Sequence, residues 1–180
     1  KIIGYGGNNN GGGLSCPGQL YTCEQGATLG ATYYGSNSGD ITISQGEIVS
    51  IYGSYTGGEI RINGGLLIIC GAVITDNLVL TNGADVQVVT GSLTVNKMGG
   101  LTTIPENCRV VLQYGTVAFN SNVNVSGSTF TLNGTMDFTQ STNIVGDGAI
   151  YNQTNTRYNG LWSGINFDAT QLTECENNGN

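Results

Sequence analysis

The chain is 180 residues long, with 30 glycines, two prolines and charged residues at only 9% of its positions. Such a composition is rich in turn formers and poor in helix-forming Lys, Glu and Arg, so it favours a single all-β domain. The net charge is −7 and the five basic residues are scattered, which argues against nucleic acid as a partner and against attachment to anionic membranes. No apolar run approaches the roughly 20 residues that cross a bilayer, so we expect no membrane insertion.

The N-terminal region contains two segments that precede any regular pattern. Residues 1–15 are rich in glycine and asparagine, and we interpret them as a tail. Residues 16–39 contain three tyrosines and an irregular pattern. We interpret this second segment as an N-terminal cap that covers the open end of a repeat array.

Five cysteines indicate an oxidising, extracellular setting. Cys16 and Cys23 are separated by six residues, a loop that closes easily, and we predict a disulfide between them. The sequence leaves the pairing of Cys70, Cys108 and Cys175 open. We interpret Cys70, which lies within LLIICG, as a small buried hydrophobic residue.

A repeat organises residues 40–160. The phrases ITISQG, EIRINGG and NLVLTNG alternate apolar and polar residues and end at glycine, and the glycines at positions 46, 65 and 83 are spaced by 19 (65 − 46) and 18 (83 − 65) residues. A short strand that returns at a fixed interval is typical of a solenoid. At about 3.3 Å per residue, such a coil makes a circuit of roughly 60 Å, enough for three short strands. We therefore predict a single right-handed parallel β-helix, a three-sided β-solenoid with irregular caps at both ends.

Alternation also predicts which side chains fill the interior. Successive coils are expected to stack about 4.8 Å apart, so that their aliphatic residues form inward columns. These residues are Ile41, Ile43, Ile60, Ile62, Leu78 and Leu80. Thr42, Arg61 and Val79 lie between them and are expected to face outward.

The later coils show one irregularity and one clear circuit. The stretch KMGGLTTIPENC lengthens a coil, and Pro105 cannot donate to a central ladder, so we predict an insertion there. Residues 122–141 contain three alternating phrases, around Val123, Phe130 and Met136, which predict three strands in one turn. Residues 161–180 break the pattern and carry the only tryptophan, Trp162. We interpret them as a C-terminal cap and tail.

The residue types needed for common catalytic and metal sites are scarce. Histidine is absent, which excludes Ser-His-Asp and Cys-His arrangements, and the cysteine spacings contain no CxxC pair. The strongest enzyme hypothesis places Glu59 beside Asp40 or Asp76 on neighbouring coils, where two carboxylates could act as acid and base. Isolated carboxylates near turns are more often local hydrogen-bonding residues, so we predict that the protein is not an enzyme and holds no metal or cofactor.

Two binding alternatives remain open. Aromatic side chains could form a sugar-stacking surface, although packing at corners and ends explains them as well; they are Tyr52, Tyr55, Tyr114, Tyr151, Tyr158 and Trp162. A flat threonine face would indicate an ice-binding solenoid, but the sequence has only one clean Thr-x-Thr, at residues 129–131.

The phrases EIRINGGLLIICGAVI, NLVLTNGADVQVV and NVNVSGSTFTLNGTMDF resemble the right-handed β-helix segments of large secreted bacterial surface proteins, in particular the adhesin-like proteins of Bacteroidota. The resemblance covers about residues 40–160. It implies a cell-surface or extracellular location, a structural or adhesive role, and partners that are extracellular proteins, other copies of the chain, or glycans. It transfers no functional residues to this chain.

Overall fold

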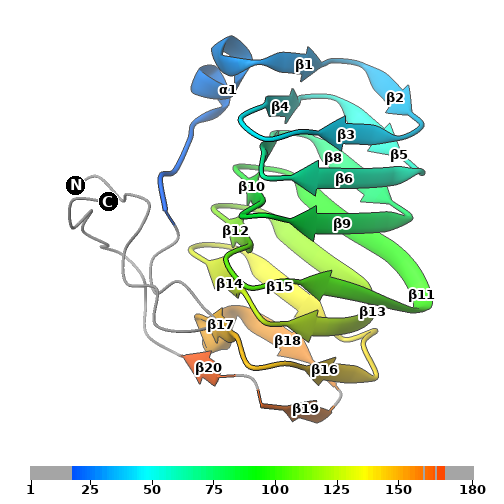
Figure 1. Cartoon of the computed structure of the whole chain (residues 1–180), viewed down its shortest axis with the longest axis vertical. Coiled ribbons are helices and arrows are strands. Elements are labelled where there is room, and N and C mark those ends of the chain that lie inside the picture. The colour runs from blue at the N-terminus through cyan, green and yellow to red at the C-terminus, as the bar shows by residue number, and fades with distance from the viewer. Residues whose placement is uncertain (1–17, 160, 165, 169–180) are drawn as a thin grey trace.

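The computed structural model describes residues 18–159, 161–164 and 166–168, and in them the chain forms the predicted three-sided parallel β-solenoid of about seven turns. Figure 1 shows the coils stacked along the long axis, from the N-terminal strands at one end to the C-terminal strands at the other. Besides the strands, the described residues form a seven-residue helix, α1 (Cys23–Leu29), and a short 3-10 helix, η1 (Gln153–Asn155).

The first side of the coil is an eight-stranded parallel sheet. Its members, in spatial order, are β1 (Ala31–Tyr33), β4 (Ile48–Ile51), β7 (Leu66–Ile69), β10 (Asp85–Val88), β12 (Arg109–Leu112), β14 (Ser128–Thr131), β17 (Ala149–Tyr151) and β20 (Asn166–Asp168).

The second side is formed by the main path of a nine-stranded sheet. This path contains β2 (Ser36–Ser38), β5 (Ser54–Thr56), β8 (Ala72–Thr75), β11 (Ser92–Ile104), β13 (Thr116–Val125), β15 (Thr135–Phe138) and β18 (Thr156–Tyr158). Two further strands of this sheet continue it past the second side: β16 (Asn143–Val145) pairs with the end of β13, at Val123 and Asn124, and β19 (Leu161–Ser163) pairs with β16.

The third side starts as a sheet of three strands, β3 (Ile41–Ile43), β6 (Glu59–Asn63) and β9 (Asn77–Thr81). In the coils that follow, β11 and β13 are 13 and 10 residues long. Figure 1 shows these two long strands bending around the molecule below β9, so they supply the second side and then the third.

The interior is filled by the columns that alternation predicted. Ile41, Ile60 and Leu78 align in register, and so do Ile43, Ile62 and Leu80, with side chains that are at most 4% exposed. The residues between them, among them Thr42 and Arg61, face outward. Packing of each aliphatic column against the others removes these side chains from water, and burial of apolar surface is the main stabilising contribution in a folded domain.

The predicted insertion lengthens one coil. Register partners on the first side are separated by 18 residues between Ile48 and Leu66, but by 24 (109 − 85) between Asp85 and Arg109. The extra residues produce a break in register within β11, between Asn96 and Leu101. Bulges of this kind bend a strand without ending it, and this one lies where β11 turns toward the third side.

The chain before β1 crosses the outer face of the first side (Figure 1), and we call residues 18–29 the N-terminal strap. Its helix begins with a capping box: the Thr22 side chain accepts from the Gln25 amide (3.1 Å), and the Gln25 side chain accepts from the Thr22 amide (2.9 Å). Within the region predicted as an N-terminal cap, β1 and β2 pair with the strands of the next coil. Residues 1–15, the predicted tail, lie outside the described residues.

The predicted Cys16–Cys23 disulfide is wrong, because Cys23 is bonded to Cys70 with Cα atoms 6.0 Å apart. The pair is separated by 47 residues in sequence. The short loop between the two cysteines favoured Cys16 as the partner of Cys23. Instead, α1 places Cys23 against the sheet at the end of β7, where Cys70 follows Ile69. The interpretation of Cys70 as an inert buried residue is corrected at the same time, and Cys16 lies outside the described residues.

Candidate functional site

The described tyrosines of the sugar-stacking alternative lie in different parts of the fold. Tyr55 is 1% exposed and belongs to the core, where its hydroxyl donates to the Gly39 carbonyl, and Tyr158 packs against the same core. Tyr52 lies near the N-terminal strap, stacked on Tyr34 with ring centroids 5.1 Å apart. All three side chains therefore contribute to packing, and the ligand-facing alternative is wrong for Tyr55, which is fully buried.

The other predicted aromatics are equally dispersed. Tyr151 is 9% exposed and stacks on Phe130, with centroids 4.8 Å apart, on the outer face of the first side. Tyr114 is 60% exposed in the turn before β13. The Trp162 side chain lies outside the described residues. The described tyrosines of this set therefore lie at separate places in the fold, in the core, at the outer face of the first side and in turns.

The three carboxylates of the enzyme hypothesis hold a corner of the solenoid together. Asp40 accepts from the Glu59 amide (2.8 Å), and Asp76 accepts from the Gly58 amide (3.3 Å). The Glu59 carboxylate is in turn bound by Arg61 (2.9 Å) and by the Asn77 side chain (2.7 Å). Each carboxylate thus has a structural partner, and the described residues contain no group of three or more His, Cys, Asp or Glu side chains placed to hold a metal ion.

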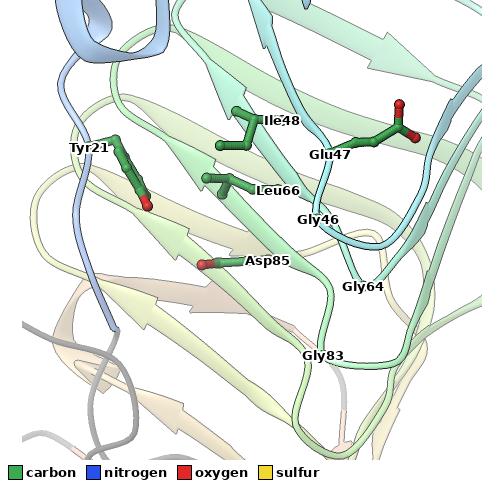
Figure 2. Close-up of a pocket in the computed structure, with 9 residues that line it drawn as sticks. Tyr21, Gly46, Glu47, Ile48, Gly64, Leu66, Gly83 and Asp85 are labelled. Carbon is green, nitrogen blue, oxygen red and sulfur yellow. The ribbon is translucent and has the colours of Figure 1, made fainter. Parts of the chain in front are cut away.

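A hollow of about 280 Å³ lies between the N-terminal strap and three successive glycine corners. Figure 2 shows the Tyr21 side chain extending from the strap toward Leu66 and Asp85, whereas the Glu47 side chain points away from Tyr21. Burial, and secondly the negative charge of Asp85, raise the pKa of Tyr21. The phenol therefore stays protonated at neutral pH, and the hollow offers a hydrogen-bonding site without an activated nucleophile.

A second hollow, of about 370 Å³, lies at the register break in β11. It is lined by Gly99, Leu101 and Val145 among others, and the nearby Met98 is 63% exposed. Asn122 at its edge is already engaged, because its side-chain oxygen accepts from Thr142 and Asn143. The insertion therefore makes a shallow apolar depression with few hydrogen-bonding groups to orient a ligand.

The outer face of the second side repeats from coil to coil. Two outward columns of small side chains run along it in unbroken parallel register. The first contains Ser36, Ser54, Ala72, Ser92, Thr116 and Thr135. The second contains Ser38, Thr56, Ile74, Thr94, Ala118, Asp137 and Arg157. We call these two columns the hydroxyl face.

The hydroxyl face is exposed and, over its first five coils, uncharged. Its residues are exposed or half-buried, in contrast to the fully buried residues of the same strands that point inward. The charged members, Asp137 and Arg157, occupy the last two positions of one column. The face thus combines hydroxyl and methyl groups on a rigid parallel sheet, with the coil spacing of about 4.8 Å between neighbours in a column.

Sequence reasoning missed this face, although a signal was present. Six times a glycine is followed by a small residue, any residue and then another outward residue: GSNS, GSYT, GAVI, GSLT, GTVA and GTMD. The search for Thr-x-Thr overlooked the phrases because serine and alanine replace threonine in most of them. The Thr-x-Thr that was found, at residues 129–131, points inward in β14, where both threonines are buried.

No protein-family model, curated protein or solved structure matches the chain significantly. Among the described residues, no helix has the length and apolar character needed to cross a membrane.

Proposed function

We propose that the chain is a non-enzymatic, extracellular β-solenoid that acts as a structural or adhesive module of a larger cell-surface assembly, as in the secreted bacterial surface proteins that its sequence resembles. The observation that carries this proposal is the hydroxyl face. It is a rigid surface whose neighbouring positions repeat from coil to coil, and it presents no cleft that would select one small molecule.

A face of this kind suits contact with a flat, hydroxyl-rich surface such as an insoluble polysaccharide. Each serine or threonine hydroxyl can both donate and accept a hydrogen bond. The face can therefore bind a partner surface that presents donors, acceptors or both. Individual contacts would be weak, but a rigid array makes many of them at once, and linked weak contacts raise the overall affinity strongly.

Two further observations support the extracellular and non-enzymatic parts of the proposal. The Cys23–Cys70 disulfide is of the kind that persists in oxidising compartments. The carboxylates that could act as acid and base, Asp40, Glu59 and Asp76, are bound to main-chain amides or to polar side chains at a corner. These hydrogen bonds give each carboxylate a structural role at the corner.

Adsorption to cellulose and chitin particles tests the proposal. The face variant Thr56→Lys/Thr116→Lys places two ammonium groups on the hydroxyl face, and the control variant Thr42→Lys/Thr103→Lys places two on exposed positions of β3 and the end of β11. We expect the native chain and the control to adsorb alike to at least one particle type, and the face variant to lose at least tenfold in affinity. Equal adsorption of the two variants would exclude the face as the contact surface.

Ice binding is a second candidate function that the same face favours. A flat array of hydroxyl and methyl groups on a rigid sheet can order water at its surface, and the structure supplies two such columns where the sequence showed one Thr-x-Thr. Thermal hysteresis of the native chain, abolished in the face variant and retained in the control variant, would support this function. A freezing point equal to that of a solution of an unrelated protein at the same concentration would rule it out.

A further inference from the structure

The outer face of the first side differs from the hydroxyl face because the N-terminal strap covers it. Ser50, Ile68 and Gln87 align in one outward column, and each is 0% exposed. The inward residues on either side of them, such as Leu67 and Ile69, belong to the core. This sheet is therefore buried on both faces in the coils that the strap crosses.

Side chains of the sheet bind the strap mainly at main-chain atoms of the strap. The Gln87 side chain donates to the Gln19 carbonyl (2.7 Å) and accepts from the Tyr21 amide (3.1 Å). The Gln113 side chain donates to the Tyr21 carbonyl (2.9 Å) and to the Gln87 side-chain oxygen (3.2 Å). Two linked glutamines on neighbouring outward positions thus bind three main-chain groups of an extended segment, a mode that depends little on side-chain identity.

The helix of the strap, α1, is also in direct contact with the sheet. The Ser50 hydroxyl donates to the Gly26 carbonyl (3.0 Å) and the Tyr52 hydroxyl to the Cys23 carbonyl (2.5 Å). A Cβ on Gly26 would lie 2.9 Å from both hydroxyl oxygens and 3.3 Å from an Ile68 methyl carbon. Apart from the chain itself, the covalent link between the described part of the strap and the solenoid is the Cys23–Cys70 disulfide.

The strap and the solenoid are separable parts of the structure. Members of the main core cluster come from the strands and the corners between them, and none comes from residues 18–29. Leu20 packs against the small outer cluster of Val111, Phe130, Ala149 and Tyr151. Removing the strap would therefore uncover outer side chains without opening the interior of the coil.

We infer that the N-terminal strap is a redox-controlled cover, fastened by the Cys23–Cys70 disulfide over a surface built to receive an extended segment. A dithiol reductant opens it by thiol–disulfide exchange: one thiolate attacks either sulfur to form a mixed disulfide, and the second thiolate displaces the protein sulfur. The reductant leaves as a cyclic disulfide, and Cys23 and Cys70 take up its two electrons and two protons as thiols.

Release of the strap has two structural consequences. Tyr21 forms one wall of the hollow shown in Figure 2, so the hollow opens when the strap leaves. The side-chain amides of Gln87 and Gln113 lose their main-chain partners in the strap, and the side chain of Ile68 is uncovered. The oxidised chain keeps this surface closed.

Hydrogen exchange with mass spectrometry on the full chain tests the inference. We expect dithiothreitol to raise the exchange rate of amides in residues 19–29 at least tenfold, while amides of β7 and β10 keep their protection. Strap protection that persists after complete reduction, or loss of protection in strap and strands together, would overturn the inference.

Dithiothreitol acts on every disulfide in a chain, so a variant isolates the relevant one. The double variant Cys23→Ser/Cys70→Ser, kept oxidised, should show the same fast exchange in residues 19–29, and Cys108→Ala, which removes a buried free thiol, should match the native chain. Slow strap exchange in the double variant would contradict the inference even if dithiothreitol had released the strap. A double variant that fails to fold would leave the native chain under dithiothreitol as the deciding measurement.

Discussion

The buried threonines of β14 are the clearest energetic anomaly at the scale of single residues. Thr129 and Thr131 occupy inward positions in register with Val110 and Leu112, and both are 0% exposed. Neither hydroxyl has a hydrogen-bond partner among the described residues. A buried hydroxyl without a partner costs free energy, because it gave up its hydrogen bonds to water on folding.

Valine should therefore be better than threonine at these positions. It has the same branched shape and no hydroxyl, so Thr129→Val and Thr131→Val should each raise the free energy of unfolding by about 1 kcal/mol. Urea unfolding of the native and variant chains at one pH would measure the change.

The matched control is the same substitution at a satisfied threonine. Thr102 is also buried, but its hydroxyl lies 2.8 Å from the Ser121 hydroxyl. Thr102→Val should lower stability by roughly 1 to 3 kcal/mol, because it leaves Ser121 without this bond. If all three variants shift stability in the same direction, the account of the β14 hydroxyls is wrong.

At the scale of elements, the glycines of one corner determine how closely successive coils approach one another. Between the first and second sides, a Cβ on any of five successive corner glycines would lie 2.0 to 2.1 Å from the carbonyl oxygen of the glycine in the preceding coil. These residues are Gly53, Gly71, Gly91, Gly115 and Gly134. The corner is thus a ladder of glycines stacked directly on one another.

Substitution of glycine by alanine should therefore lower the free energy of unfolding by different amounts inside and outside this ladder. Gly71→Ala in the ladder meets backbone atoms that cannot move alone, so we expect a loss of roughly 2 to 3 kcal/mol in the free energy of unfolding. Gly83 has φ of +78° and open space for at least 4 Å around the position that a Cβ would take, so Gly83→Ala should cost only the strain of a left-handed backbone, about 1 kcal/mol. Chemical unfolding of both variants measures the difference, and equal losses would contradict the steric role of the ladder.

The alternation of apolar and polar residues predicted the strands well where apolar residues occupied only one face of the strand. The inward aliphatic columns at Ile41, Ile60 and Leu78 follow from alternation, because a period of two assigns each side chain to one face. The same rule does not say which face is the core when both are buried. In β14, Phe130 is the outward residue and stacks on Tyr151, and the two threonines point inward.

Long-range contacts were beyond the reach of the sequence. The Cys23–Cys70 bond joins residues 47 positions apart, and it depends on where the N-terminal strap crosses the sheet. The hydroxyl face likewise depends on register between coils, since no single phrase shows that Ser54, Ser92 and Thr116 share one column. A repeat in the sequence predicts stacking, but the outward surface emerges only when every coil is placed on the next.

The whole molecule is a rod with three unlike sides. The first side is covered by the N-terminal strap, the third side carries charged and polar residues such as Arg61 and Glu59, and the second side presents the hydroxyl face. The chain has a net charge of −7, yet the first five coils of that face are uncharged. A negatively charged rod with one neutral side remains dispersed in solution and can still approach a neutral surface closely.

The salt dependence of adsorption tests this account most directly. Contact through a neutral face involves hydrogen bonds and close packing, and neither is screened by ions, whereas charge-mediated attachment weakens once the Debye length falls to a few ångströms. We predict that the native chain adsorbs to cellulose or chitin particles with the same affinity in dilute buffer and at about 1 M salt. Adsorption that disappears at high salt, or that the Thr56→Lys/Thr116→Lys variant retains in full, would contradict the claim that the hydroxyl face makes the contact.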